Sequence, residues 1–277
     1  MVCTIKEQVF PASLIKDKFF ILTGMDATTE QTLLSIIIAT YNAGAELEAC
    51  LASIAAQPVR NMEVWVIDGG STDGTQHILQ SLNMPKLRWI SEPDEGIYDA
   101  LNKGIRLARG KWLYFMGADD RLLPGFSELA IRLKEPSTVY YGNSEPFYGD
   151  QPPAMELLSG KFSPYRLAKH CMNHQAILYP AAAFQKYRYN LKYRVYADYA
   201  LNIQLWGDGA FKKEFHPFTI VRYNMTGFSA ASDDMAFKHD KLQLIRQHMG
   251  WGMYIRMRWK QLKKRWQGEP DFWDPGG

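Results

Sequence analysis

The chain has 277 residues, of which 47% are hydrophobic and 22% are charged, and its formal net charge is +3. This length suits one large α/β domain or a domain with an appended subdomain, and the weak net charge gives no electrostatic reason to expect nucleic-acid binding. Its three cysteines are far apart in the sequence, which argues against a disulfide framework or a zinc cluster and fits a reducing cytoplasmic setting.

The N-terminal residues 1–32 have a mixed character and are predicted to form an extension that packs on the domain. Their longest apolar stretch, residues 19–22, is too short to span a membrane and follows no signal-peptide plan. Residues 33–40 are almost continuously aliphatic, which is typical of a strand buried on both faces of a parallel sheet.

A helix is predicted over residues 46–57, because Leu47, Leu51 and Ile54 recur at helical spacing. A second apolar strand follows over residues 63–67. Two strands joined by a helix of this length form a right-handed βαβ unit.

The same alternation continues with a short strand over residues 87–90, an amphipathic helix over residues 96–109 and a strand over residues 111–116. Gly110 follows the helix and is the expected helix stop. Alternating strands and helices indicate an open parallel sheet flanked by helices.

After residue 120 the pattern changes. A strand pattern returns over residues 138–148, and residues from about 160 to 230 mix aromatic and polar side chains with short apolar runs. Residues 233–267 are predicted to be helical, and the Pro- and Gly-containing residues 268–277 are predicted to be a disordered tail.

The loop over residues 68–75 follows a strand and precedes a helix, so its small residues and backbone amides allow a ligand to approach closely. It lacks the Lys of a phosphate loop and the three glycines of a dinucleotide loop. Asp68 is a candidate acceptor of hydrogen bonds from a base or ribose, and Asp73 is expected to cap the next helix. Taken alone, the loop is better explained by turn and cap chemistry than by ligand binding.

Asp119 and Asp120 directly follow the strand over residues 111–116. Ligands bind at the carboxyl ends of parallel strands, and hard carboxylate oxygens suit Mg²⁺ or Mn²⁺. The other interpretation is a cap for the helix expected to begin near Pro124. The residues alone leave both alternatives open.

Several segments carry a common pattern: residues 36–42, 66–75, 102–104 with 108–110, and 117–120. Together they closely resemble the family 2 glycosyltransferases, which have the GT-A fold, a Rossmann-like and mostly parallel sheet flanked by helices. The segment 91–104 resembles the branch that builds bacterial exopolysaccharide and lipopolysaccharide side chains.

The resemblance implies a catalytic domain over residues 33–232, followed by the helical extension. Within it, residues 33–135 would be the half that binds a nucleotide-diphosphate sugar, and residues 136–232 would be the acceptor half. The donor-binding residues that the resemblance implies are Thr40, Tyr41, Asn42, Asp68, Gly70, Asp94, Asn102, Lys103, Ala118 and Asp119.

The resemblance also implies a bound Mn²⁺ or Mg²⁺, with Asp119 as the metal ligand and Asp120 in support. The chain departs from the family's pattern at two positions, where Gly69 and Gly117 stand in place of aspartates. Metal binding would therefore rest on Asp119.

Asp198 stands at the position of the family's catalytic base, and the alternative for this residue is a helix N-cap. His174 and Gln175 are weaker candidates for contact with the donor phosphates or the acceptor. A lone histidine is more often structural, and a neutral imidazole would donate a hydrogen bond here rather than take the proton.

The predicted C-terminal helix has one apolar stripe, formed by Trp251, Ile255, Trp259, Leu262 and Trp266, and no acidic residue between Gly252 and Gln267. Six basic residues share this stretch, a combination typical of helices that lie on anionic lipid. The alternative is packing of the tryptophans on the domain or on a second subunit in a homodimer.

The sequence thus predicts a metal-dependent, inverting, non-processive glycosyltransferase (a hexosyl- or N-acetylhexosaminyltransferase) at the inner face of a bacterial membrane. It would transfer one sugar, from a UDP-sugar by expectation, to a lipid-linked or polysaccharide acceptor. Its rivals are a nucleotidyltransferase and a catalytically degenerate binding or scaffold subunit, the latter suggested by Gly69 and Gly117.

Overall fold

The computed structural model describes residues 31–148, 159–225, 233–269 and 273. The chain divides into two compact units, Met1–Gln31 and Thr32–Gly277, and the elements described here belong to the second. The expected N-terminal extension therefore lies almost wholly outside the described residues.

Four parallel strands form the first half of the sheet, and each was expected from its apolar run. They are β1 (Leu34–Thr40), β2 (Met62–Asp68), β3 (Leu87–Ser91) and β4 (Trp112–Gly117), in the spatial order β3-β2-β1-β4. Their carboxyl ends therefore lie along one edge, where ligands bind in open α/β sheets.

The second half of the sheet is mixed. It continues β4-β7-β6-β8-β5, and its strands are β5 (Arg121–Leu122), β6 (Thr138–Phe147), β7 (Ile177–Pro180) and β8 (Lys212–Asn224). β7 runs antiparallel to both β4 and β6, whereas β8 runs parallel to β6. β7 and β8 were not predicted individually, because their apolar runs are short or interrupted by charged residues.

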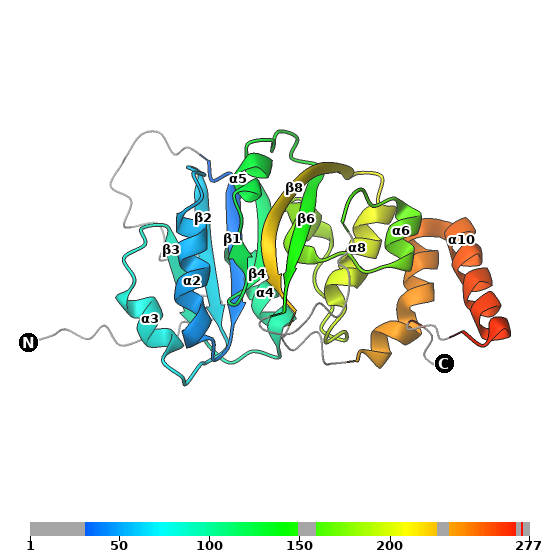
Figure 1. The fold of residues 1–277 in the computed structure, drawn as a ribbon, viewed down its shortest axis with the longest axis horizontal. Helices are drawn as coiled ribbons and strands as arrows, with labels where there is room; N and C mark the ends of the chain where they lie inside the picture. Colours follow the sequence, from blue (N-terminus) through cyan, green and yellow to red (C-terminus); the bar gives the residue numbers. More distant parts are fainter. Residues whose placement is uncertain (1–30, 149–158, 226–232, 270–272, 274–277) are drawn as a thin grey trace, which may run out of the picture. The chain divides into compact units, whose positions relative to one another are not determined.

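Helices cover both faces of this eight-stranded sheet (Figure 1). Alternation along β1 divides the core: Ile36 and Ile38 belong to one hydrophobic cluster and Ile37 to the other. The first cluster includes buried residues of α2 (Gly44–Ala55), α3 (Thr75–Ser81) and α5 (Gly125–Ala130). The second includes those of α4 (Ile97–Leu107), α6 (Pro164–Lys169), α7 (Ala183–Lys186), α8 (Ala197–Gly207) and α10 (Met235–Gln267).

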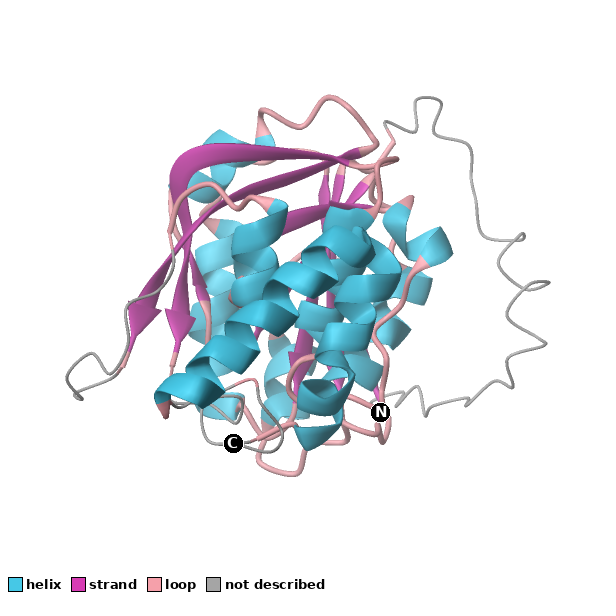
Figure 2. Ribbon diagram, turned by 90° about the vertical axis from the view of Figure 1, so that its right-hand side faces the viewer, coloured by secondary structure: helices cyan, strands magenta, loops and turns pink. Residues whose placement is uncertain are grey.

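α10 changes direction at Gly250, whose backbone angles, φ 85° and ψ 171°, are not helical. A positive φ of this kind is readily adopted only by glycine. Its first part packs against α8 through Phe237, Leu244 and Ile245, and its second part buries Met257. Figure 2, which looks at the right-hand side of Figure 1, shows the helices of this region in front of the strands.

Trp273 lies in an aromatic cluster with Tyr196, Tyr199 and Phe237, at ring-centroid distances of 5.1, 5.2 and 5.9 Å. The tail was expected to be disordered; of its residues the structure describes 268, 269 and 273, and the half-buried ring of Trp273 packs against the domain. Within the described residues, none of the helices has both the length and the apolar character needed to cross a bilayer.

Candidate active site

The loops that follow β1 and β2 are bound to one another by hydrogen bonds. The Asn42 backbone amide donates to Ser71 Oγ (2.7 Å), and Asn42 Oδ1 accepts from the Thr72 amide (2.9 Å). Asn42 adopts a positive φ of 50°, which asparagine tolerates better than most residues. Asp73 accepts from the Gly44 amide at the start of α2 and from the Thr75 amide at the start of α3. Asn42 thus shapes the loop pair, and Asp73 serves both helix starts although Gly74 is the formal N-cap of α3.

Asp68, at the end of β2, is fully buried. Its Oδ2 accepts from the Ser71 amide (3.0 Å) and from Ser91 Oγ (2.6 Å), and its Oδ1 accepts from Ser71 Oγ. A ligand reaches this carboxylate only if one of these bonds opens. Asp68 therefore holds the loop in this structure, and its direct contact with a donor stays a prediction.

The accessible part of this edge is formed by Tyr41 and Asp94. The Tyr41 side chain is 65% exposed. A Cβ added at Gly69 would lie 2.7 Å from Asp94 Oδ2 and 3.4 Å from Tyr41 Cδ2, so the tyrosine ring and the carboxylate both lie close to this glycine. Asp94 Oδ1 accepts from the Gly96 amide (2.9 Å). Beside them, the buried Thr40 Oγ1 has no hydrogen-bond partner within the described part of the chain.

Two expected donor-binding residues of α4 are used inside the protein. Asn102 donates to the Tyr189 carbonyl (2.8 Å) and accepts from the Tyr189 amide (3.1 Å). Lys103 Nζ donates to the Pro93 carbonyl (2.6 Å) and lies 3.0 Å from a Glu92 carboxylate oxygen. Both side chains are buried and fix the loops around the site, and their direct contact with a donor stays a prediction.

Asp119 and Asp120 form the turn between β4 and β5. They do not cap α5, whose N-cap is Pro124 and which begins only at Gly125. Two small residues were also expected to bind the donor. Ala118 precedes the aspartate pair and is buried, and Gly70, in the loop after β2, has a positive φ of 84°; each contributes backbone rather than a side chain to the site. Because the N-cap of α5 is Pro124, the alternative that Asp119 and Asp120 cap this helix is excluded.

Asp120 is only 1% exposed and its oxygens are occupied. Oδ2 accepts from the Gly117 amide (2.8 Å) and from Gln175 Nε2 (3.2 Å), and Oδ1 accepts from the Asn224 amide (3.1 Å). Burial and the neighbouring charge of Asp119 raise the pKa of Asp120 to about 7. In this structure Asp120 holds the turn, and its expected support of a metal stays a prediction.

Asp119 fits a divalent-cation site to which the protein contributes one carboxylate. Its side chain is half-buried, Oδ2 accepts from Asn224 Nδ2 (2.8 Å), and Oδ1 lies over Gly117. The described ranges contain no group of three or more His, Cys, Asp or Glu side chains suited to a metal. One or two carboxylates combined with substrate phosphates and water is a common Mg²⁺ arrangement. Asp119 fits the expected Mn²⁺ or Mg²⁺ in this way.

Asp198 lies in the first turn of α8, but the N-cap of that helix is Tyr196, so the cap alternative is again excluded. Its side chain is 13% exposed. Oδ1 lies 3.1 Å from Tyr98 Oη and accepts from the Tyr199 amide (2.7 Å). Burial raises the pKa of Asp198 to about 7, which is the range of a general base at neutral pH.

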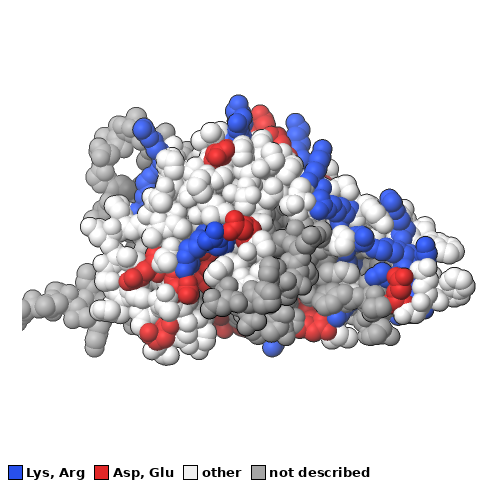
Figure 3. All heavy atoms as spheres, in the orientation of Figure 1, with Lys and Arg blue, Asp and Glu red and all other residues white. Residues whose placement is uncertain are grey.

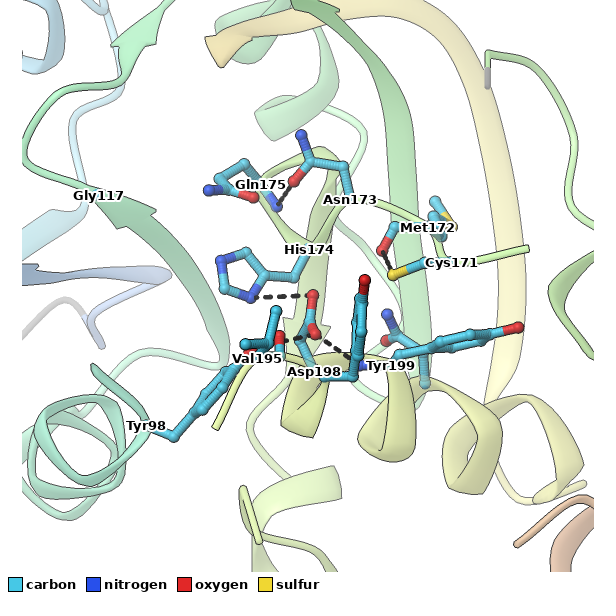
Figure 4. A network of polar contacts seen from close by, with 12 residues as sticks. Tyr98, Gly117, Cys171, Met172, Asn173, His174, Gln175, Val195, Asp198 and Tyr199 are labelled. Atoms are coloured by element: carbon cyan, nitrogen blue, oxygen red, sulfur yellow. Dashed lines mark hydrogen bonds and ion pairs between the residues drawn. The ribbon is translucent and has the colours of Figure 1, made fainter. Parts of the chain in front are cut away.

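His174, from the 3-10 turn His174–Ala176, points toward Asp198 (Figure 4). Its Nδ1 lies 3.7 Å from Asp198 Oδ2 and has no hydrogen-bond partner within the described residues. Burial lowers the pKa of His174 to about 4, so the imidazole is neutral and the contact is not an ion pair at neutral pH.

The turn that carries Asp119 and the helix that carries Asp198 approach one another through residues 174 and 175. Asp120 accepts from Gln175, whose neighbour His174 faces Asp198, and Asp198 is linked to Tyr98 on α4. Gln175 is buried and its main-chain carbonyl accepts from Tyr114 Oη of β4 (2.7 Å), so it ties the Asp120 turn and β4 to the 3-10 turn, and its contact with a ligand stays a prediction. The titratable groups around Asp198 are Tyr98, Cys171, His174, Tyr179, Tyr189, Tyr196 and Tyr199.

Two residues of this arrangement were not predicted. Tyr98 lies within the segment 91–104 that carried the family resemblance, so its position was a usable signal. Asn224 ends β8 and contacts both Asp119 and Asp120, more than 100 residues earlier in the chain. The sequence marked Asn224 only as the start of a loop, residues 224–229, that was expected to close over the donor, and residues 226–229 lie outside the described residues.

The sequence pattern of the family described as "Glycosyl transferase family 2" matches residues 35–190, more than half of the chain. The chain belongs to this family. This glycosyltransferase is 37% identical over 206 residues to the PGL/p-HBAD biosynthesis glycosyltransferase of Mycobacterium tuberculosis, a match that covers 70% of the chain and 78% of the relative. It is also 39% identical over 101 residues to the chondroitin synthase of Escherichia coli, covering 36% of the chain and 15% of that enzyme.

Solved structures agree on the fold of the glycosyltransferase. Residues 1–349 of S. aureus TarS in complex with UDP-GlcNAc match with a TM-score of 0.63 at 16% identity, covering 78% of this chain and 65% of that one, slightly under two thirds. The mannosyltransferase PcManGT of Pyrobaculum calidifontis, in complex with GDP-Man and Mn²⁺, matches with a TM-score of 0.55 at 16% identity, covering 79% and 64%. The expected GT-A fold is confirmed.

Proposed function

We propose that this glycosyltransferase is metal-dependent, inverting and non-processive, and that it transfers one sugar from a UDP-sugar to a lipid-linked saccharide in bacterial surface-glycan synthesis. The observation that carries the proposal is the placement of Asp198. This carboxyl, with its pKa raised to about 7, is joined through His174 and Gln175 to the Asp119–Asp120 turn at the end of β4.

The donor side of the proposal rests on the edge formed by Tyr41, Asp94 and Thr40. An exposed tyrosine ring offers a stacking surface for a base, and the adjacent carboxylate offers an acceptor for base or ribose hydrogen bonds. Related folds are known with UDP-GlcNAc and with GDP-Man, which supports a nucleoside diphosphate sugar as the class of donor. We assign uridine as the expected base.

Asp119 would hold the Mn²⁺ or Mg²⁺. When bound, such a cation supplies positive charge that stabilises the departing diphosphate. The chain itself orients the Asp119 carboxylate through Asn224 and leaves space for it over Gly117.

Asp198 acts as the base in the proposed reaction. It takes the proton of an acceptor hydroxyl while that oxygen forms a bond to the anomeric carbon, and the bond from this carbon to the diphosphate oxygen breaks on the opposite face. The electron pair of the broken bond leaves with the diphosphate, so the configuration inverts. Burial lowers the pKa of His174 to about 4, so the imidazole beside Asp198 stays neutral at the pH of the reaction.

The proposed acceptor is a saccharide linked to a membrane lipid, and the protein would act peripherally at the inner face of the bacterial membrane. The exposed tryptophans of α10 support this location. The naming of the mycobacterial relative as a biosynthesis glycosyltransferase supports a synthetic rather than a degradative role.

A donor screen tests the proposal. The full chain is incubated with UDP-, GDP-, CDP- and dTDP-sugars, with Mn²⁺ or with a chelator, and nucleoside diphosphate release is measured. We expect metal-dependent release from a UDP-sugar, and loss of release in Asp198→Asn. Tight donor binding without any turnover, with any sugar, would instead identify a degenerate binding subunit.

A further inference from the structure

The second part of α10 carries an exposed apolar stripe on the side away from the domain. Trp251, Trp259 and Trp266 are 62%, 69% and 89% exposed, and Ile255 and Leu262 between them are also exposed. Their spacing places all five within about 80° of the helix circumference. Met257 and Gln261, on a different side of the same helix, are buried. The helix therefore has one face for the domain and another for a partner.

Basic side chains border this stripe on both sides. By the helical rotation of about 100° per residue, Arg256 and Lys263 lie along one border and Arg258 and Arg265 along the other. Figure 3 shows Lys and Arg side chains gathered over the end of the unit where α10 lies. The Arg256 guanidinium lies over the ring of Tyr165 in α6 (3.5 Å to the centroid), so this border of the stripe adjoins the domain.

We propose that this stripe is the membrane contact of the protein, and that its partner is an anionic lipid surface. Tryptophans are favoured at the headgroup level of a bilayer, and lysine and arginine at the stripe borders complement anionic lipid headgroups. The charge of the borders favours an anionic bilayer over a second copy of the chain. In a dimer formed through this stripe the basic borders of the two copies would repel one another, whereas an anionic bilayer is complementary to both borders at once. The inference deepens the proposed function by placing α10 against the membrane that would present the acceptor.

Flotation of the full chain with lipid vesicles tests the inference. We expect binding to phosphatidylcholine vesicles that contain phosphatidylglycerol, weaker binding without it, and weakening at high salt. Trp259→Ser is expected to lower the vesicle affinity about tenfold, from the apolar area lost. Lys263→Gln is expected to lower it about fivefold, at about 1 kcal/mol per basic residue near the surface.

The matched control is Ile131→Ser, which removes an exposed apolar side chain from another part of the domain and should leave vesicle binding unchanged. Sedimentation of the free protein is measured in parallel. If the wild type does not float, or if Trp259→Ser floats equally well, the inference is overturned. Conversion of a dimer to a monomer by Trp259→Ser, without vesicle binding by the wild type, would assign the stripe to a subunit interface. Because none of these readouts uses turnover, they can fail or succeed independently of the proposed reaction.

A separate observation concerns Gly69. Its φ is not in the left-handed region, so its backbone does not require glycine, yet a Cβ there would lie 2.7 Å from Asp94 Oδ2 and 3.2 Å from Asp94 Cγ. The Asp94 carboxylate is fixed by its bond from the Gly96 amide. A side chain at position 69 would therefore displace the Asp94 carboxylate from its present position.

We infer that Gly69 is a positioning residue: it leaves the space through which Asp94 reaches the nucleoside beside Tyr41. This inference rests on the proposed donor site. Gly69→Ala is expected to weaken UDP binding in the presence of Mn²⁺ about as much as Asp94→Ala does, roughly tenfold for one lost hydrogen bond to a charged group. Because both act through the same carboxylate, the double variant should be no weaker than either single variant.

Calorimetry with UDP and Mn²⁺ on the four proteins completes the cycle. Additive losses, or a Gly69→Ala variant that binds UDP normally, would overturn the role of Gly69. Failure of the wild type to bind UDP would instead remove the proposed donor. Gly209→Ala, at a glycine where an added Cβ meets nothing within 4 Å, is the control and should bind as the wild type does.

Discussion

The two halves of the sheet build their parts of the site in different ways. On the side of β1, β2 and β3, short loops hold one another through hydrogen bonds such as those of Asn42 to Ser71 and Thr72. On the side of β7 and α8, Asp198 and His174 are buried in a packed aromatic region and carry shifted pKa values. The proposed donor side is thus ordered by local loop chemistry, and the proposed acceptor side by burial.

This difference separates two kinds of carboxylate. Asp68 and Asp120 are buried and fully engaged, so they organise loops, whereas Asp119, Asp94 and Asp198 retain exposed surface. Substitutions of the buried carboxylates should lower the folding stability, and substitutions of the partly exposed carboxylates should affect the reaction.

The largest effect is expected at Asp119. Asp119→Ala should abolish transfer and the metal dependence of UDP binding, while the melting temperature stays near that of the wild type. The matched change Asp120→Ala leaves buried donors of Gly117, Gln175 and Asn224 without an acceptor, and should lower the stability by about 1–3 kcal/mol for each unsatisfied group. Calorimetry and thermal melting of both variants check this. Equal metal-dependent binding in Asp119→Ala would remove the assigned ligand.

The second-largest effect is expected for Asp198→Asn. It keeps the size of the side chain but cannot take a proton, so kcat should fall by about 10²–10⁴ with UDP binding unchanged. Glu214→Gln, which changes an exposed carboxylate on β8, is the control and should retain full activity. Near-normal turnover in Asp198→Asn would place the base elsewhere, with His174 the first residue to examine.

The pH dependence should follow the same carboxyl. Since burial raises the pKa of Asp198 from 3.8 to about 7, kcat/KM should rise about tenfold per pH unit below neutrality and level off above it. The contribution of Asp198 to the free energy of unfolding changes with pH in the opposite direction. The folded state keeps a proton that the unfolded chain loses near pH 4, so this contribution is complete below about pH 4 and is lost as the pH rises through about 7. Rate profiles and melting curves of the wild type and Asp198→Asn measure both; an Asp198→Asn melting curve that keeps the same loss of stability through neutral pH would contradict the assignment.

The smallest effect is expected at Asn102. Asn102→Ala removes both hydrogen bonds to the Tyr189 backbone, and leaving those groups buried should cost about 1–3 kcal/mol. The melting temperature should fall by about 2–10 °C. Gln80→Ala, an exposed change at the surface of α3, is the control. If UDP affinity fell in Asn102→Ala without loss of stability, Asn102 would be a donor contact after all.

Much of the donor half could be predicted from the sequence. Strands β1, β2 and β4 are nearly continuous apolar runs, and Asn42 and Asp119 stand where such strands end, so periodicity and position were sufficient. The functions of Asp68, Asn102, Lys103 and Asp120 could not be read in this way, because whether a polar side chain faces a ligand or the protein depends on partners distant in the chain. Asn102, for example, is bonded to a residue 87 positions later.

The acceptor half was less predictable for a related reason. Asp198 was found only through the family resemblance, and its alternative as a helix cap was excluded by the observed start of α8. Its raised pKa results from burial by several elements, which no local pattern encodes. Asn224 shows the same limit, since its two contacts join β8 to the end of β4.

The break in α10 at Gly250 separates two tasks within one segment of chain. Residues before it complete the core against α8, and the exposed stripe lies wholly after it. The proposed membrane surface can therefore be altered by design at five outward-facing positions, while the rest of the domain keeps its packing.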